Sequence, residues 1–279
     1  MFKKTFIAGA AVATLGVSTL ALADDAASPW TFTGNIGLYS QYVFRGLTQT
    51  NEKPAYQGGF DFSYNFGPAS FYLGTWGSNI TWLTDSLQYT SSSLESDWYG
   101  GFRGNFGKSD FTYDVGYLYY WYPGEVLPIF GEKGDTQEVY AQLGYKWITA
   151  KYSYGVGNSY FAVRDADGTW YLNLTATVPL WDSGFTATAH WGDQKYTGTD
   201  NRLPIVSTLG TCTSNDDCFS YTDWLVGVSY DMSKLSKGLS GVTFGVNYTN
   251  TDAKDVGYTN IFSRNIGKDE WTFYLSKAL

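Results

Sequence analysis

The sequence predicts an all-β protein, a transmembrane antiparallel up-and-down β-barrel of about twelve strands that follows an N-terminal signal peptide. Three observations indicate this fold class. Apolar and polar residues alternate along most of the chain, which is typical of strands with one face in an apolar medium and the other in water. Short and long connections alternate between the predicted strands. The chain also begins with an export signal.

Residues 1–23 have the features of a cleaved signal peptide. Lys3 and Lys4 form a basic start, an apolar stretch follows, and Ala21-Leu22-Ala23 matches an A-x-A cleavage site. A membrane anchor is the alternative, but the apolar stretch is short for a spanning helix and ends at the cleavage triplet. We therefore expect residues 24–279 to form the barrel domain, exported to the cell outer membrane of a Gram-negative bacterium.

The composition excludes several classes of protein. The chain holds 24 Tyr, 18 Phe and 11 Trp, while charged residues make up only 16% of it. A single His and two Cys exclude histidine-cysteine metal clusters and scaffolds held by many disulfides. The formal net charge of −8 does not suit nucleic acid binding.

Twelve segments carry the alternating pattern. In the eighth, Trp170, Leu172 and Leu174 alternate with Tyr171 and Asn173. Each segment has one apolar face, which we expect to meet lipid; packing into a soluble β core is the alternative. The predicted strands lie near residues 31–46, 55–66, 69–78, 96–106, 110–122, 135–147, 149–158, 168–179, 183–193, 220–230, 240–250 and 269–279.

The connections between these segments are sorted by length. Those after even-numbered strands are short, such as Gly67-Pro68 and Gly107-Lys108-Ser109, whereas those after odd-numbered strands are long and polar. An even-stranded barrel with both termini in the periplasm has tight turns on that side and long loops outside. Aromatic residues near strand ends, such as Trp98 and Trp121, fit the aromatic girdles of such barrels. A soluble sandwich has no reason to sort its loops in this way.

The first third of the mature chain resembles a known family. Residues 37–50 (GLYSQYVFRGLTQT), 54–61 (PAYQGGFD) and 71–79 (FYLGTWGSN) resemble blocks of the TorF family of proteobacterial porins. Residues 95–101 and 119–124 are similar to later blocks of that family. The resemblance implies an outer-membrane β-barrel channel and names no substrate.

The end of the chain departs from the usual pattern of outer-membrane barrels. Trp271, Phe273 and Leu275 alternate as expected, but Lys277 and Leu279 stand where an apolar and an aromatic residue are common. Such endings help the barrel-assembly machinery to recognise the last strand. We expect this machinery, outer-membrane lipid and lipopolysaccharide as partners, while the oligomeric state stays open.

Charged residues on the polar faces are candidates for lining the lumen. Arg45 and Asp61 lie on adjacent strands, where they either bind a polar solute or form a buried ion pair that fixes strand register. Because the whole set holds four charges of each sign, we expect a wall of balanced charge. The other candidates are Arg103, Asp114, Glu138, Lys146, Lys151, His190 and Asp223.

His190 decides whether an enzyme is plausible. It is the only conventional base for a serine hydrolase, and an outer-membrane phospholipase also uses a twelve-stranded barrel. However, the chain lacks a G-x-S-x-G motif, and the strand phase points His190 into the lumen. We expect it to hydrogen-bond to Thr or Tyr, with no catalytic residue, cofactor or metal.

The favoured function is passive diffusion of small hydrophilic solutes through the barrel. Twelve strands enclose a lumen wider than eight strands can fill and narrower than that of a sixteen-stranded porin. An outer-membrane lipid-acting enzyme and a plugged structural or adhesive barrel are the alternatives.

The third outer loop contains an unusual apolar run. Leaving these side chains in water forfeits about 1.5 to 3 kcal/mol each, so the run should seek cover. We expect it to fold inward and narrow the channel; packing at the rim, or contact with lipopolysaccharide or a second subunit, is the alternative. The candidates are Glu125, Val126, Leu127, Ile129 and Phe130.

The two cysteines lie close together in the longest outer loop. Cys212 and Cys218 are separated by Thr-Ser-Asn-Asp-Asp, which can form a turn. Two cysteines in an exported chain usually pair, so we expect a disulfide that stiffens the tip of this loop.

Overall fold

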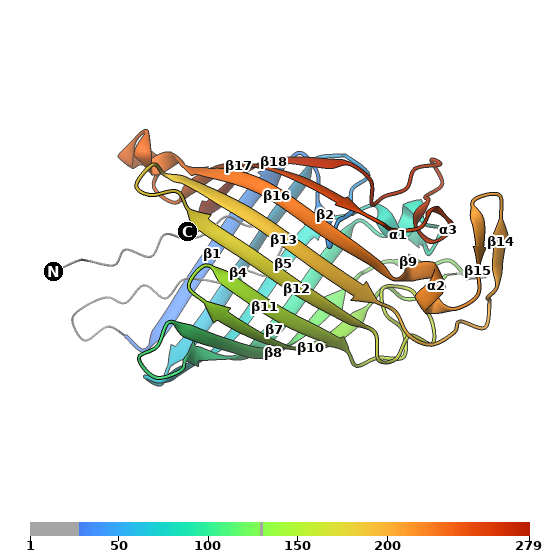
Figure 1. Ribbon diagram of the computed structural model, residues 1–279, viewed down its shortest axis with the longest axis horizontal. Coiled ribbons are helices and arrows are strands. Elements are labelled where there is room, and N and C mark those ends of the chain that lie inside the picture. The colour runs from blue at the N-terminus through green and yellow to red at the C-terminus, as the bar shows by residue number, and fades with distance from the viewer. Residues whose placement is uncertain (1–27, 129–130) are drawn as a thin grey trace.

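The computed structural model describes residues 28–128 and 131–279, and within them twelve strands close into one antiparallel barrel (Figure 1). β1 pairs with both β4 and β18, which closes the wall. The predicted fold class is confirmed, whereas the predicted signal peptide lies outside the described residues. The barrel strands are β1 Trp30–Tyr39, β4 Ala55–Asn65, β5 Ala69–Asn79, β7 Leu94–Asn105, β8 Phe111–Trp121, β10 Thr136–Tyr145, β11 Ile148–Gly155, β12 Trp170–Pro179, β13 Phe185–Lys195, β16 Tyr221–Asp231, β17 Val242–Thr251 and β18 Glu270–Ala278.

The two ends of the barrel differ in their connections. Short turns lie at the end that also holds the C-terminus (Figure 1), and the longest of them contains the 3-10 turns η1 Met232–Lys234 and η2 Lys237–Leu239. The long loops lie at the other end, as the sorted loop lengths predict. We call them L1 (40–54), L2 (80–93), L3 (122–135), L4 (156–169), L5 (196–220) and L6 (252–269).

Most of the long loops contain short elements of their own. L1 holds the strands β2 Val43–Phe44 and β3 Leu47–Thr48, which pair with each other. No helix among the described residues is long and apolar enough to cross a membrane. The remaining loop elements are α1 Trp82–Asp85, β6 Tyr89–Ser91, β9 Glu125–Val126, β14 Ile205–Ser207, β15 Gly210–Cys212, α2 Asn215–Phe219 and α3 Asp255–Tyr258.

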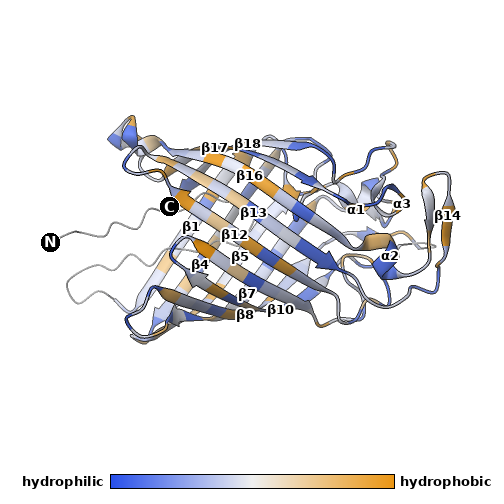
Figure 2. Ribbon diagram, in the orientation of Figure 1, coloured by the Kyte–Doolittle hydropathy of each residue, from blue (hydrophilic) through white to orange (hydrophobic). Residues whose placement is uncertain are grey.

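The wall is apolar outside and polar inside. Apolar and polar residues alternate along the strands (Figure 2), and the burial of side chains alternates with them. On β10, for example, Val139 and Leu143 are exposed on the outer surface while Glu138 is fully buried. Closure leaves no unpaired edge on the wall, so the outer face suits a hydrocarbon environment.

Tyrosines fill much of the interior by lying over glycines of neighbouring strands. A Cβ atom added to Gly74 would lie 2.3 Å from the ring of Tyr99, and one added to Gly245 would lie 2.3 Å from the ring of Tyr274. Only glycine leaves room for a ring at such a distance. The rings therefore lie close against the wall, and their hydroxyl groups contribute to a polar interior.

Candidate functional site

L1 enters the lumen through a tight hairpin formed by β2 and β3. We call residues 43–48 the L1 hairpin. Arg45 and Gly46 form its two-residue turn, with φ of 47° and 78°. Turns that join paired strands through two residues commonly need a positive φ at both positions, which glycine supplies without strain. Gly46 also lies close to the barrel wall: a Cβ atom added to it would lie 2.4 Å from Thr251 Cγ2.

The side chain of Arg45 extends from the tip of the hairpin to the opposite wall of the barrel. L1 joins β1 to β4, and in the closed order of the barrel three strands lie between β1 and β13 and three lie between β4 and β10. Nevertheless Arg45 Nη2 donates to Glu138 Oε1 on β10 at 2.7 Å, and Nη1 donates to Gln194 Oε1 on β13 at 2.8 Å. The side chains of Arg45 and Glu138 are only 7% and 0% exposed. The hairpin thus crosses the lumen and ends in a buried ion pair.

Aromatic rings and a third oxygen complete the surroundings of the guanidinium group. Its central carbon lies 4.2 Å from the ring centre of Tyr171 and 4.8 Å from that of Phe44. Nη1 also donates to the hydroxyl of Tyr160 in L4 at 2.6 Å. The hydroxyl of Tyr221 donates to the carbonyl oxygen of Arg45 at 2.9 Å, which fixes the turn itself. The guanidinium group of Arg45 thus has a carboxylate partner, two further hydrogen-bond acceptors and aromatic rings beside it.

His190 belongs to the hydrogen-bond network that holds Tyr171. Its Nε2 lies 2.8 Å from Asp223 Oδ1 and 3.0 Å from the Tyr171 hydroxyl, which donates to Asp223 Oδ2 at 2.9 Å. Its Nδ1 lies 3.1 Å from Thr175 Oγ1. His190 is buried in the lumen, and its neighbours are the Tyr and Thr residues that the sequence predicts. The network holds the ring of Tyr171 in place against Arg45.

L2 packs over the base of the L1 hairpin. Tyr42, at the start of the hairpin, belongs to one apolar cluster with Ile80 and Leu83 of L2 and with Leu118 of β8. The hydroxyl of Tyr42 donates to Glu95 Oε1 at 2.9 Å. Apolar packing and a buried hydrogen bond therefore fix the near end of the hairpin, while Arg45 fixes the far end.

The predicted pair of Arg45 and Asp61 does not form. Arg45 lies at the tip of a crossing hairpin and not on the first strand, so its acidic partner is Glu138. Asp61 Oδ1 instead accepts a hydrogen bond of 2.9 Å from the hydroxyl of Tyr99. The remaining lumen candidates on the wall, with the exception of Lys146, face inward: Arg103, Asp114, Glu138, Lys151, His190 and Asp223.

The expected balance of charge on the wall is wrong for two reasons. Lys146 is exposed in the β10–β11 turn, because β10 ends at Tyr145. Three inward carboxylates were also missed, although Glu95 and Asp97 share the phase of the inward Tyr99 and could have been found from it. The interior is therefore acidic. Among the described residues its carboxylates are Asp61, Glu95, Asp97, Asp114, Glu138, Asp223 and Glu270, against the cations Arg45, Arg103, Lys151 and Arg264, a residue of L6 that pairs with Glu270.

The described residues of L3 pack against L2 and do not fold into the lumen as expected. Glu125 and Val126 form β9, which pairs with β6 of L2 at the outer end of the barrel (Figure 1). The backbone N–H of Leu127 donates to the carbonyl oxygen of Gln88 at 2.9 Å. The apolar run finds cover against L2, while Ile129 and Phe130 lie outside the described residues. Among the described residues, the L1 hairpin crosses the lumen and narrows it.

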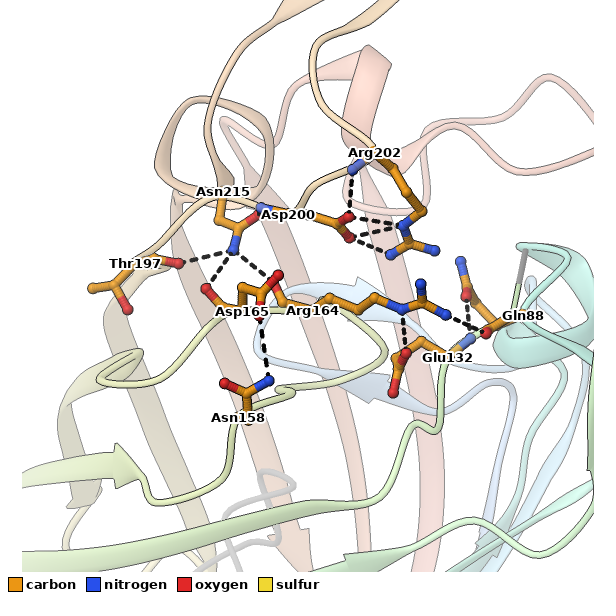
Figure 3. A network of polar contacts seen from close by, with 10 residues as sticks. Gln88, Glu132, Asn158, Arg164, Asp165, Thr197, Asp200, Arg202 and Asn215 are labelled. Atoms are coloured by element: carbon orange, nitrogen blue, oxygen red, sulfur yellow. Dashed lines mark hydrogen bonds and ion pairs between the residues drawn. The ribbon is translucent and has the colours of Figure 1, made fainter. Parts of the chain in front are cut away.

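A polar network joins L4 and L5 at the rim (Figure 3). Asn215 Nδ2 donates to the carbonyl oxygens of Arg164, Asp165 and Thr197 at 2.8, 3.1 and 2.9 Å. Asn215 begins α2, which contains Cys218, and this cysteine forms a disulfide with Cys212 of β15. The disulfide and the amide together fix the base of the β14–β15 hairpin.

Ion pairs and a cavity lie in the same region. Arg164 pairs with Glu132, and Arg202 pairs with Asp200 (Figure 3). Partial burial acts to raise the pKa of Asp200, but hydrogen bonds from Arg202 outweigh it and lower the pKa below its ordinary value. Beside them is a cavity of about 430 Å³, whose lining includes three carboxylates and one arginine. These are Glu132, Asp135, Asp165 and Arg164.

Comparison with known proteins identifies a family and several similar barrels. A family model described as "Bacterial protein of unknown function (Gcw_chp)" matches residues 23–279. No curated protein sequence matches the chain. The NanC porin has 12% identity and a TM-score of 0.46, with coverage of 89% of this chain and 98% of that one.

Two further solved structures are similar at the same level. The TodX monoaromatic hydrocarbon channel has 9% identity and a TM-score of 0.46, with coverage of 91% of this chain and 90% of that one. OmpF of Salmonella typhi, solved with daunomycin, has 11% identity and a TM-score of 0.38, with coverage of 90% and 97%. The description of the matching family states no function.

Proposed function

We propose that this chain, which belongs to the Gcw_chp family of bacterial proteins of unknown function, forms an outer-membrane channel for passive diffusion of small hydrophilic solutes. The L1 hairpin would control passage through its lumen. A closed wall with an apolar outer face and a charged interior supports this proposal. The predicted export signal and the resemblance to the TorF family also support an outer-membrane channel.

The observation that carries the proposal is the way the L1 hairpin is held. A lumen that stays sealed needs no buried ion pair, because apolar residues of similar volume often stabilise a core equally well or better. A buried pair, by contrast, is stable only while both partners are present. The pair of Arg45 and Glu138 therefore suits a hairpin with a docked and an undocked position.

The two alternatives fit the site less well. A lipid-acting enzyme would need His190 near the outer surface, but His190 is enclosed with Asp223 and Tyr171 inside the wall. A plugged structural or adhesive barrel shares the crossing hairpin, and the experiment below separates it from a channel. The partners that we propose are outer-membrane lipid, lipopolysaccharide and the barrel-assembly machinery.

Conductance across a planar lipid bilayer tests the proposal. We would compare the wild-type barrel with a variant in which residues 42–49 are replaced by Gly-Ser-Gly. The control is a variant that shortens the β14–β15 hairpin, which projects away from the barrel (Figure 1). A channel predicts a severalfold larger conductance for the L1 variant only. A channel also predicts a reproducible current through the wild-type barrel. A folded wild type that carries no current, with current only in the L1 variant, would reject the channel in favour of a barrel that the L1 hairpin plugs.

A further inference from the structure

We infer that the wall around Arg45 is a binding site for solutes that carry a guanidinium group, and that Arg45 occupies this site as an internal surrogate. This inference rests on the proposed channel function and names the class of solute that displaces the hairpin. The site consists of Glu138, Gln194, Tyr160 and Tyr171, none of which belongs to the L1 hairpin. Removal of the hairpin tip would leave these groups in the wall and in L4.

The acceptor groups are oriented without help from Arg45. Gln194 Nε2 donates to the carbonyl oxygen of Trp170 at 3.0 Å, which turns Oε1 toward the lumen. The hydroxyl of Tyr171 donates to Asp223 at 2.9 Å, which fixes the ring. The hydroxyl of Tyr160 donates to Glu138. A site whose groups are already fixed loses little freedom when a ligand binds.

The chemistry of the site selects a planar cation. A buried carboxylate excludes anions, and two further oxygens accept hydrogen bonds from Nη1 of the guanidinium group. The ring of Tyr171 at 4.2 Å offers a face on which a flat, weakly hydrated cation can stack. A primary ammonium ion is compact and strongly hydrated, so it would satisfy fewer of these groups.

The surrounding charges favour the same class of solute. Carboxylates outnumber cations on the inner wall, and Glu132, Asp135 and Asp165 line the cavity at the rim. The negative charge of these groups raises the local concentration of cations at the rim and in the lumen. A solute with a guanidinium group would thus be attracted to the mouth and would compete with Arg45 for Glu138.

The experiment measures binding and does not depend on conductance. The melting temperature of the detergent-solubilised Arg45→Ala barrel is followed by heat-dependent gel mobility with methylguanidinium or with neutral methylurea. At ten times the dissociation constant we expect methylguanidinium to raise the melting temperature by about 3 to 6 °C. The matched control is Arg164→Ala, which removes one partner of a partly exposed ion pair at the rim. Methylguanidinium should not raise the melting temperature of this variant. Equal shifts with both compounds, or equal shifts in both variants, would overturn the inference.

The wild-type barrel provides a second measurement should Arg45→Ala fail to assemble. Trypsin can cleave the Arg45–Gly46 bond only when the hairpin leaves the lumen, whereas Lys237 is exposed in a turn and serves as the reference. Methylguanidinium at ten times its dissociation constant should raise the ratio of the two cleavage rates about tenfold. A ratio that methylguanidinium leaves unchanged would refute displacement of Arg45. Because neither measurement needs a current, failure of this inference is distinguishable from failure of the channel.

Discussion

Replacement of Glu138 by glutamine tests whether one ion pair holds the L1 hairpin across the lumen. Glutamine has nearly the same shape as glutamate but removes the negative charge next to Arg45. The guanidinium group would then be buried beside Gln194, Tyr160 and the new amide, without a carboxylate at hydrogen-bond distance. We expect the hairpin to undock while the barrel wall stays intact.

The magnitude follows from the burial of the pair. Arg45 Nη2 and Glu138 Oε1 are 2.7 Å apart, and both side chains are almost completely enclosed. Removal of one partner of such a pair costs about 3 to 5 kcal/mol. Part of this cost is recovered because the undocked Arg45 returns to water, so we use the lower value. About 3 kcal/mol corresponds to a population of undocked hairpin that is roughly 100-fold larger.

Cleavage by trypsin at Arg45–Gly46 reports this population directly. When opening and closing are fast, the cleavage rate tracks the fraction of open hairpin. The rate should therefore rise roughly 100-fold in Glu138→Gln relative to cleavage at the exposed Lys237. Glu132→Gln is the matched control, because Glu132 pairs with Arg164 at the rim and not in the lumen. An unchanged ratio in a folded Glu138→Gln barrel would refute the role of the ion pair.

Three further predictions concern the loops and the wall. Cys212→Ser should loosen only L5, at the base of the β14–β15 hairpin, by at most about 2 to 3 kcal/mol, so hydrogen exchange should rise in α2 while the melting temperature of the barrel stays constant. A hydrogen bond from Arg264 lowers the pKa of Glu52 from 4.5; their contact is therefore stabilising above that pH and is lost as the pH falls through the lowered value. The protection factors of the L6 amides, which are corrected for the intrinsic pH dependence of hydrogen exchange, should thus fall on acidification in the wild type, and Glu52→Gln should remove this dependence. Gly101→Ala should impair assembly, because the new Cβ would lie 2.2 Å from the carbonyl oxygen of Val115; a heat-modifiable band of normal yield would contradict this.

The strands could be predicted from the sequence because lipid and water impose opposite demands on the two faces of a barrel strand. The same pattern misled at the first strand, which was expected to reach residue 46 but ends at Tyr39. Alternation continues through Tyr42 and Phe44 because the L1 hairpin is itself built of paired strands. Periodicity cannot tell a strand of the wall from a strand that leaves it.

For a related reason, local sequence patterns could not predict which residues Arg45 contacts. Arg45 was recognised as a lumen residue, but its contact with Glu138 depends on how far a loop reaches across a closed barrel. Asp97 and Glu270 were overlooked although both lie within predicted strands and share the inward phase of Tyr99 and Tyr274. Lys146 shows the opposite error, since its alternation continues one position beyond the end of β10.

The position of the L1 hairpin also has a consequence for the order of assembly. Arg45 lies near the start of the chain, yet its side chain meets Gln194 after 149 residues and its carbonyl oxygen meets Tyr221 after 176. Contacts at such separations form late, because the intervening chain must first be ordered. The hairpin has no complete docking place until β16 has joined the wall. Protection of the Arg45–Gly46 bond from protease is therefore a marker of the nearly finished barrel, and it distinguishes that state from earlier inserted intermediates.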